Sequence, residues 1–360
     1  MRVVFPVPAG LNRAANGYFE GMRDILPTLV RWRSEGRQVA IATVVERRGS
    51  APRDPGASLA LNDRGEIAGS VTGGCVEPSV IREAQEVLNG GAARAREYGI
   101  TDDEAFEVGL SCGGTVVILI AKLDSSLLPA LDEAVRTDRP IAMTMNASGP
   151  ALGEQHVHDG AEGSVTQLLA SGESTLAEVE GETLFVHALT PRPAMYVFGA
   201  IDHAAALARV GKLLGYRVTV CDARAAFVTP ERFPEADELV VEWPDRFLRN
   251  APVDESTAIC VLTHDQKFDV PALVAALETP AVYIGAMGSK VTTADREERL
   301  RAEGVADAGI ARIHAPIGLA IGARSPEEVA VAIGAQIVEA TAVARRRRAA
   351  ERSPVSLLTS

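Results

Sequence analysis

The chain has 360 residues, in which 36 basic and 48 acidic side chains leave a formal net charge of −12. A hydrophobic content of 47% and a charged content of 23% are typical of globular proteins and exclude the disordered and fibrous classes. Aromatic residues make up only 4% of this acidic chain, so we expect no basic, base-stacking face that binds nucleic acid. The length predicts two domains, each with its own core.

The cysteines and the apolar segments indicate the compartment. Cysteines stand at positions 75, 112, 221 and 260, too far apart for the CxxC knuckle of a structural zinc site. No segment approaches the roughly twenty apolar residues of a membrane span, and residues 1–21 lack the apolar core of a signal peptide. We therefore expect a cytoplasmic protein with reduced thiols and no membrane contact.

The first half of the chain is predicted to form an α+β domain over residues 22–122, preceded by an N-terminal extension at 1–21. Apolar spacing predicts a helix over 22–36 and a second helix directly after Glu77. Strands are predicted at 38–46, 57–62, 66–71 and 116–121. Residues 123–190 are interpreted as a connecting subdomain with mobile loops, because a Gly/Ser/Glu-rich stretch separates its predicted helix (127–137) and strand (140–145) from a second strand at 182–189.

Residues 191–344 have a more regular pattern. Short apolar strands near 195–199, 217–221, 238–241, 258–262 and 281–284 are spaced about one βα unit apart. This alternation predicts a doubly wound parallel sheet with helices on both faces. The last helix is predicted to begin at a capping box of Ser325 and Glu328, and residues 345–360 are predicted to be a tail. The predicted fold class is α/β, an N-terminal α+β domain followed by a Rossmann-like domain.

The first predicted strand of the Rossmann-like domain runs into a glycine-rich turn at Gly199. In a dinucleotide-binding fingerprint the second glycine lets pyrophosphate approach the backbone, but here Ile201 takes its place. Asp222 follows the second strand, where a ribose-binding acid is expected. Gly199 therefore either belongs to a nicotinamide dinucleotide (NAD(P)) site or only makes a tight turn in a Rossmann-like scaffold.

Cys75 and Cys112 each stand beside a Gly-Gly pair, which leaves room for a bulky ligand next to the thiol. Cys75 also precedes a predicted helix, whose N-terminal field favours the thiolate, a suitable ligand for a soft metal or a persulfide sulfur. Cys112 leads into a buried strand, so an inert packed thiol is the alternative there. Core packing is the expected role of Cys221 and Cys260.

Further candidates lie in a stiff loop and at one edge of the predicted parallel sheet. Arg53, between two prolines, either clamps a phosphate through its guanidinium or is a solvated surface arginine. The carboxyl ends of the strands are where ligands bind in this architecture. Asp222, Arg224, His264 and the segment that contains Gly285 are expected to converge there.

These motifs together resemble a known family. The segments RGSAPR (48–53), GSVTGGCVE (69–77), LSCGG (110–114), GYRVTVCDAR (215–224), VLTHD (261–265), YIGAMGS (283–289) and PIGLAIGARSPEE (316–328) are similar to the xanthine dehydrogenase accessory family, known as XdhC/CoxI. The resemblance covers roughly residues 22 to 340 in family order. It departs at Ile201, where many members have glycine, and at Ala320, where the family commonly has aspartate.

The resemblance implies a maturation factor that binds molybdenum cofactor, protects it during sulfuration by a cysteine desulfurase, and delivers it to the apoenzyme of a molybdenum hydroxylase. Such clients include xanthine dehydrogenase and carbon monoxide dehydrogenase. The family's first cysteine motif corresponds to Gly73, Gly74, Cys75 and Glu77, and its second to Cys112 and Gly113. The resemblance also implies a Rossmann domain at the C-terminus.

Residues and resemblance together lead to a working assignment. Cys75 is expected to touch the metal of the cofactor or its sulfur, and Arg53 its phosphate. The protein is then a non-catalytic chaperone, expected to form a homodimer. The alternatives are an NAD(P)-dependent oxidoreductase that uses the crevice near Asp222 and His264, and a sulfurtransferase in which Cys75 carries a persulfide.

Overall fold

The computed structural model describes residues 3–6, 21–50, 53–99, 114–159, 164–170, 172–263 and 265–350. Contacts divide the chain into two compact units, with a boundary between residues 191 and 192. We call the described residues 21–191 the first unit. Residues 192–350 together with the short strand at residues 3–6 are the Rossmann unit.

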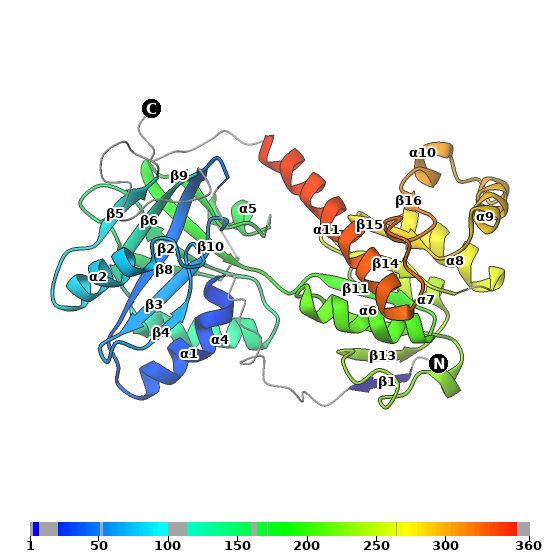
Figure 1. Cartoon of the computed structure of the whole chain (residues 1–360), viewed down its shortest axis with the longest axis horizontal. Helices are drawn as coiled ribbons and strands as arrows, with labels where there is room; N and C mark the ends of the chain where they lie inside the picture. The colour runs from blue at the N-terminus through cyan, green and yellow to red at the C-terminus, as the bar shows by residue number, and fades with distance from the viewer. Residues whose placement is uncertain are drawn as a thin grey trace. The chain divides into compact units, whose positions relative to one another are not determined.

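The first unit contains two antiparallel sheets (Figure 1). The five-stranded sheet has the order β4-β3-β2-β6-β5, and the four-stranded sheet has the order β8-β7-β10-β9. The elements are α1 (Met22–Ser34), β2 (Val39–Arg48), β3 (Ser58–Asn62), β4 (Ile67–Gly69), α2 (Glu77–Leu88), β5 (Arg94–Tyr98), β6 (Thr115–Lys122), α4 (Leu128–Arg136), β7 (Ile141–Asn146), β8 (Gln155–His158), α5 (Ser164–Ala170), β9 (Thr175–Val179) and β10 (Glu182–Leu189). The strands and helices predicted over residues 22–122 are all present, with ends shifted by a few residues.

Residues 123–190, for which the sequence predicts a connecting subdomain, form α4 and the four-stranded sheet. Their side chains share one core with α1 and the five-stranded sheet: Leu131, Met143 and Phe185 pack in the same cluster as Leu29 and Ile41. The structure therefore packs the segment into the first unit. The Gly/Ser/Glu-rich stretch contributes β8, α5 and β9 to that sheet and its cover.

A buried histidine lies between the two sheets. His187 of β10 is 1% exposed, and its Nε2 lies 3.3 Å from the hydroxyl of Thr43 on β2. Burial lowers the pKa of His187 to about 3, because the charged imidazolium would lose its hydration there.

Acid should therefore unfold the first unit partly through His187. The unfolded chain binds a proton near pH 6.5 and the folded chain only near pH 3, so stability is retained above pH 6.5 and lost as the pH falls toward 3. In this window the His187 contribution should lower the free energy of unfolding of the wild type by about 1.4 kcal/mol per pH unit. His187→Gln should lack this contribution. Urea unfolding followed by Trp32 fluorescence at pH 7 and pH 4.5 measures this; equal pH dependence in both proteins would contradict it.

The Rossmann unit is built on a sheet of order β1-β13-β12-β11-β14-β15-β16. Six strands are parallel, and β1 (Val3–Pro6) adds an antiparallel edge strand against β13. The other elements are β11 (Ala194–Phe198), α6 (Asp202–Leu213), β12 (Arg217–Cys221), β13 (Glu238–Val241), α7 (Pro244–Leu248), β14 (Ala258–Val261), α8 (Gln266–Leu277), β15 (Tyr283–Ala286), α9 (Lys290–Ala302), α10 (Asp307–Ile310), β16 (Ile313–His314) and α11 (Pro326–Ala350). This confirms the predicted α/β class and the doubly wound parallel sheet.

Alternate residues of β11 pack on opposite faces of this sheet. Met195 and Val197 pack with α6 and α11, which lie side by side, whereas Tyr196 and Phe198 pack with α7 and α8 (Figure 1). The capping box is confirmed: the Glu328 amide donates to Ser325 Oγ, and the Ser325 amide donates to the Glu328 carboxylate. Helix α11 includes the first six residues of the predicted tail and ends at Ala350. Within the described residues, no helix is long and apolar enough to cross a membrane.

Candidate functional site

The loop between β4 and α2 is organised around one carboxylate, that of Glu77, the first residue of α2. Oε1 accepts hydrogen bonds from the hydroxyl of Ser70 (2.7 Å) and from the amides of Val71, Thr72 and Gly73 (3.2, 2.9 and 3.0 Å). Oε2 accepts from the hydroxyl of Thr72 (2.7 Å) and from the amide of Gly74 (2.8 Å). Six donors from five consecutive residues thus converge on one side chain.

This concentration of donors fixes the charge of Glu77. Burial alone would raise its pKa, but the hydrogen bonds from Ser70 and Thr72 outweigh burial and lower the pKa to about 2. The loop can wrap the carboxylate because Gly73 and Gly74 have φ of +80° and +122°, which side-chain-bearing residues rarely adopt. A Cβ at either glycine would meet nothing within 4 Å, so space lies open beside this part of the loop.

Cys75 lies in this loop, two residues before α2, as predicted. Its side chain is half-buried and packs against the core beneath α2, and the adjacent Val76 is fully buried. The structure thus brings Gly73, Gly74, Cys75 and Glu77 together. The amides of both glycines donate to the Glu77 carboxylate, and both oxygens of this carboxylate are occupied by donors of the loop. Glu77 therefore holds the loop in place.

Arg53 lies at the same end of the five-stranded sheet as this loop. We call the loop between β4 and α2 the cysteine loop. The Ser70 amide donates to the carbonyl of Ser58, so this loop starts beside the first residue of β3. The bend that contains the half-buried Arg53 comes shortly before β3 in the chain. Asp54, next to Arg53, forms an exposed ion pair of 2.9 Å with Arg47. Cys112 and Gly113 lie outside the described residues.

In the Rossmann unit, the glycine-rich turn after β11 uses its own amides internally. The Gly199 amide donates to the carbonyl of Cys221, the Ile201 amide to the carbonyl of Gly199, and the Ala200 amide to the carboxylate of Asp222 at 2.8 Å. Gly199 has φ of +105°, and a Cβ there would lie 3.0 Å from the Thr263 amide. The glycine is therefore required by the close approach of this turn to the end of β14.

Asp222 is 2% exposed and is paired with Arg224. Its Oδ1 accepts from Arg224 Nε (2.9 Å) and from the Arg224 amide, while Oδ2 accepts from Arg224 Nη2 (2.7 Å). Burial alone would raise the pKa of Asp222, but these bonds and that from the Ala200 amide lower it below its usual range. The carboxylate expected to bind ribose is thus engaged by the protein itself.

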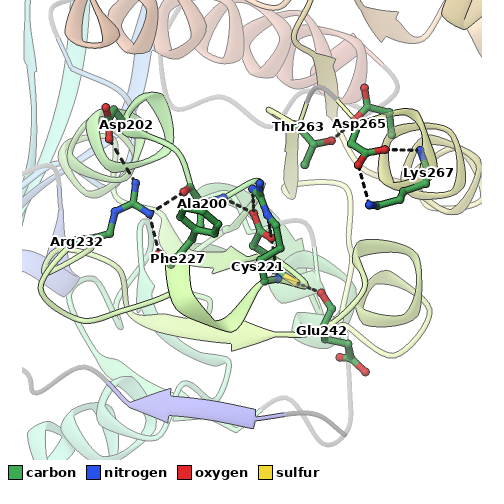
Figure 2. Close-up of polar contacts among 12 residues, drawn as sticks. Ala200, Asp202, Cys221, Phe227, Arg232, Glu242, Thr263, Asp265 and Lys267 are labelled. Carbon is green, nitrogen blue, oxygen red and sulfur yellow. Dashed lines mark hydrogen bonds and ion pairs between the residues drawn. The ribbon is translucent and has the colours of Figure 1, made fainter.

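Two arginines enclose an aromatic ring beside this turn. The guanidinium carbon of Arg224 lies 4.6 Å from the ring centroid of Phe227, and that of Arg232 lies 5.6 Å from it. Figure 2 shows Arg232 bonded to the carbonyls of Ala200 and Phe227 and to Asp202. Nothing in the sequence pattern predicts this arrangement, because Phe227 and Arg232 follow β12 in an irregular segment.

A cavity of ≈ 500 Å³ lies between the carboxyl ends of β11, β12 and β14. It is lined by Ile201, Arg224, Leu262, Thr263, Asp265, Gln266 and Phe268. This is the point where the strand order reverses between β11 and β14, the usual ligand position in such sheets.

The structure brings Asp222 and Arg224 together at this cavity, whereas His264 lies outside the described residues. Gly285 lies within β15, where a Cβ would come within 2.7 Å of both Ile317 and the Tyr283 hydroxyl, so Gly285 serves close packing. Behind the cavity, Thr263 donates to the buried Asp269, which pairs with the buried Arg296. Among the described residues, no three His, Cys, Asp or Glu side chains gather closely enough to hold a metal ion.

Comparison with known proteins supports the same division of the chain. Residues 32–99 match the model of the XdhC and CoxI family, and residues 195–337 match that of the XdhC Rossmann domain. The chain is 27% identical over 311 residues to an Escherichia coli protein named molybdenum cofactor insertion chaperone PaoD, covering 86% of this chain and 85% of that one. It is 25% identical over 332 residues to a Bacillus subtilis protein named as a probable xanthine dehydrogenase subunit, covering 88% and 95%.

A solved structure shares the fold. The crystal structure of a Bacillus halodurans protein described as a xanthine dehydrogenase matches with a TM-score of 0.69 at 24% identity, over 90% of this chain and 96% of that one. The two matched family ranges cover more than half of the 360 residues. The chain belongs to the XdhC and CoxI family.

Proposed function

We propose that this protein binds molybdenum cofactor and delivers it to a molybdenum hydroxylase such as xanthine dehydrogenase or carbon monoxide dehydrogenase. The observation that carries the proposal is the loop between β4 and α2: Glu77 holds the loop that contains the half-buried Cys75, and space lies open beside Gly73 and Gly74. A soft thiolate suits the metal of the cofactor or its sulfur. The names of the E. coli and B. subtilis relatives support a role in cofactor maturation.

Other residues complete the proposed site. Arg53, at the same end of the sheet, contacts the phosphate of the cofactor. Gly73 and Gly74 leave the space that a bulky ligand needs, and Cys112 with Gly113 forms the second cysteine motif. The cofactor is cargo that must be released, so the protein acts as a chaperone with no chemistry of its own. Its partners are the hydroxylase apoenzyme and a cysteine desulfurase, and it works as a homodimer in the cytoplasm.

Reconstitution tests this function directly. Apo-xanthine dehydrogenase is mixed with cofactor released from a molybdenum enzyme, with and without this protein, and xanthine oxidation is measured. We expect this protein to raise the recovered xanthine oxidation severalfold. The same mixture with apo-carbon monoxide dehydrogenase is assayed by CO oxidation, and no gain with either apoenzyme would contradict the proposal. A gain of one sulfur mass on Cys75 after incubation with a desulfurase, without cofactor binding, would favour the sulfurtransferase instead.

A further inference from the structure

We propose that the cavity in the Rossmann unit binds a 2-amino-4-oxopyrimidine ring, the ring edge that pterins share with guanine, and that Arg224 holds an anionic substituent of that ring. The inference rests on the proposed function, because the cargo proposed there contains this ring; the cavity is a pocket of its own, separate from the loop of Cys75, and takes the ring independently of Cys75 and Arg53. One fixed cation, one carboxylate and the apolar walls of the cavity form the proposed site.

Arg224 is a cation held in a fixed orientation. Asp222 takes its Nε and Nη2, and the ring of Phe227 packs against the guanidinium face. The side chain is still 49% exposed and lines the cavity. Within the described part of the chain, its Nη1 has no hydrogen-bond partner. A preorganised guanidinium with free donors is a strong anion ligand.

Three amides of the turn after β11 are already used within the protein. In dinucleotide-binding proteins the amides of this turn and the following helix N-terminus hold pyrophosphate. Here the amides of Gly199, Ala200 and Ile201 bond to protein oxygens, and Asp202 adds a carboxylate at the start of α6. Arg224 is the guanidinium that lines the cavity, and it is the group to which we assign the anionic substituent.

Asp265 supplies the group that recognises the ring edge. It caps α8, accepting from the Lys267 amide, and its Oδ2 lies 2.9 Å from Lys267 Nζ (Figure 2). These contacts lower the pKa of Asp265 and hold the carboxylate in place, while half of its surface remains exposed. A carboxylate has lone pairs for several donors, and the adjacent N–H and NH₂ of a 2-amino-4-oxopyrimidine present two donors side by side.

The remaining walls suit a flat ring. Ile201, Leu262 and Phe268 are apolar and line the same cavity, and a fused heterocycle packs well between such side chains. The cavity volume of ≈ 500 Å³ lies within the range of small-molecule sites. Trp243 lies next to this wall, with its ring centroid 4.9 Å from that of Phe268.

Trp243 provides the readout. It is 39% exposed, whereas the other tryptophan, Trp32, is 1% exposed in the first unit. The full chain is titrated with pterin-6-carboxylate, unsubstituted pterin, GMP, CMP and NADP, and tryptophan fluorescence is recorded. We expect saturable quenching by pterin-6-carboxylate, abolished in Trp243→Phe. Affinity should be about tenfold lower for unsubstituted pterin, which lacks the anion, and for CMP, which lacks the ring edge.

Variants test the two contacts separately. Asp265→Asn keeps a good helix cap but loses the ionised acceptor, so it should weaken pterin-6-carboxylate binding about tenfold without lowering thermal stability. Asp307→Asn removes the same charge at an exposed position of α10 and should leave binding unchanged. Arg224→Gln should reduce the affinity for pterin-6-carboxylate to that for pterin; if it fails to fold, Asp265→Asn still decides.

The outcomes separate this inference from the proposed function. No saturable binding of pterin-6-carboxylate, or equal binding by Asp265→Asn and wild type, would overturn the cavity assignment. Tighter binding of GMP than of pterin-6-carboxylate would assign the cavity to a nucleotide and overturn its assignment to the cofactor. Preferential binding of NADP would do the same. A protein that passes the reconstitution test but binds no pterin-6-carboxylate refutes only this inference.

Discussion

Replacing Glu77 with glutamine is expected to destabilise the first unit by about 2–4 kcal/mol and to release the cysteine loop. The amide would turn an NH₂ group toward donors that now meet a carboxylate oxygen, leaving the Gly74 amide or the Thr72 hydroxyl without an acceptor. The hydrogen bonds from the Ser70 hydroxyl and from the amides of residues 71–73 would lose their charge assistance, because their acceptor would be neutral. Urea unfolding followed by Trp32 fluorescence in a Trp243→Phe background measures the loss.

A neighbouring glutamate provides the matched control. Glu86 lies on the same helix α2, and its exposed carboxylate forms a 2.7 Å ion pair with Arg94. Because exposed ion pairs contribute little, Glu86→Gln should cost less than about 1 kcal/mol. In Glu77→Gln, alkylation of Cys75, followed by peptide mass spectrometry, should change in rate, while in Glu86→Gln it should match wild type. Equal stability of the two variants would show that the Glu77 carboxylate does not hold the loop.

Replacing Cys75 with alanine is expected to lower retention of molybdenum cofactor by about tenfold or more, because the proposed soft ligand is lost. The substitution removes one sulfur from a half-buried position, so the first unit should remain folded. Cys260→Ala is the control. Cys260 is fully buried in β14, and burial raises the pKa of its thiol, which keeps it protonated and away from any ligand. That variant should lose some stability and retain cofactor as wild type does.

The two glycine-rich turns share one feature, although they lie in different units. Each wraps a carboxylate of the chain itself: Glu77 in the cysteine loop and Asp222 beside Gly199. Backbone amides that often bind a ligand's phosphate are thus used for internal order. In each unit the candidate contact to a ligand is therefore a side chain and not these amides. It is Cys75 in the first unit and Arg224 in the Rossmann unit.

Local sequence signals predicted most of the elements. The capping box at Ser325 and Glu328, the apolar strands of the Rossmann unit and the hairpin of β3 and β4 depend on residues close in sequence, so their patterns were sufficient. The four-stranded sheet depends on pairing of β7 with β10 across about forty residues, which periodicity does not reveal. Strand β1 has four residues and pairs with the distant β13, so nothing nearby indicated it.

The candidate residues were easier to name than to assign a role. The glycines and Cys75 were singled out by type and spacing and Glu77 by the family resemblance, but the convergence of six donors on Glu77 needs the loop geometry. Ser70 and Thr72 just before two glycines were the available signal. Asp222 and Arg224 were expected in one crevice, with Asp222 as a ribose-binding acid; the pairing of Asp222 with Arg224 appears only in the structure.

Native mass spectrometry of the wild-type protein and of Cys75→Ala, both purified from a host that makes molybdenum cofactor, tests the central claim most directly. We predict a bound species with the mass of the cofactor on the wild type, and its loss from Cys75→Ala but not from Cys260→Ala. A wild-type protein that carries no pterin species even when cofactor is supplied, or a Cys75→Ala variant that retains it fully, would contradict the account.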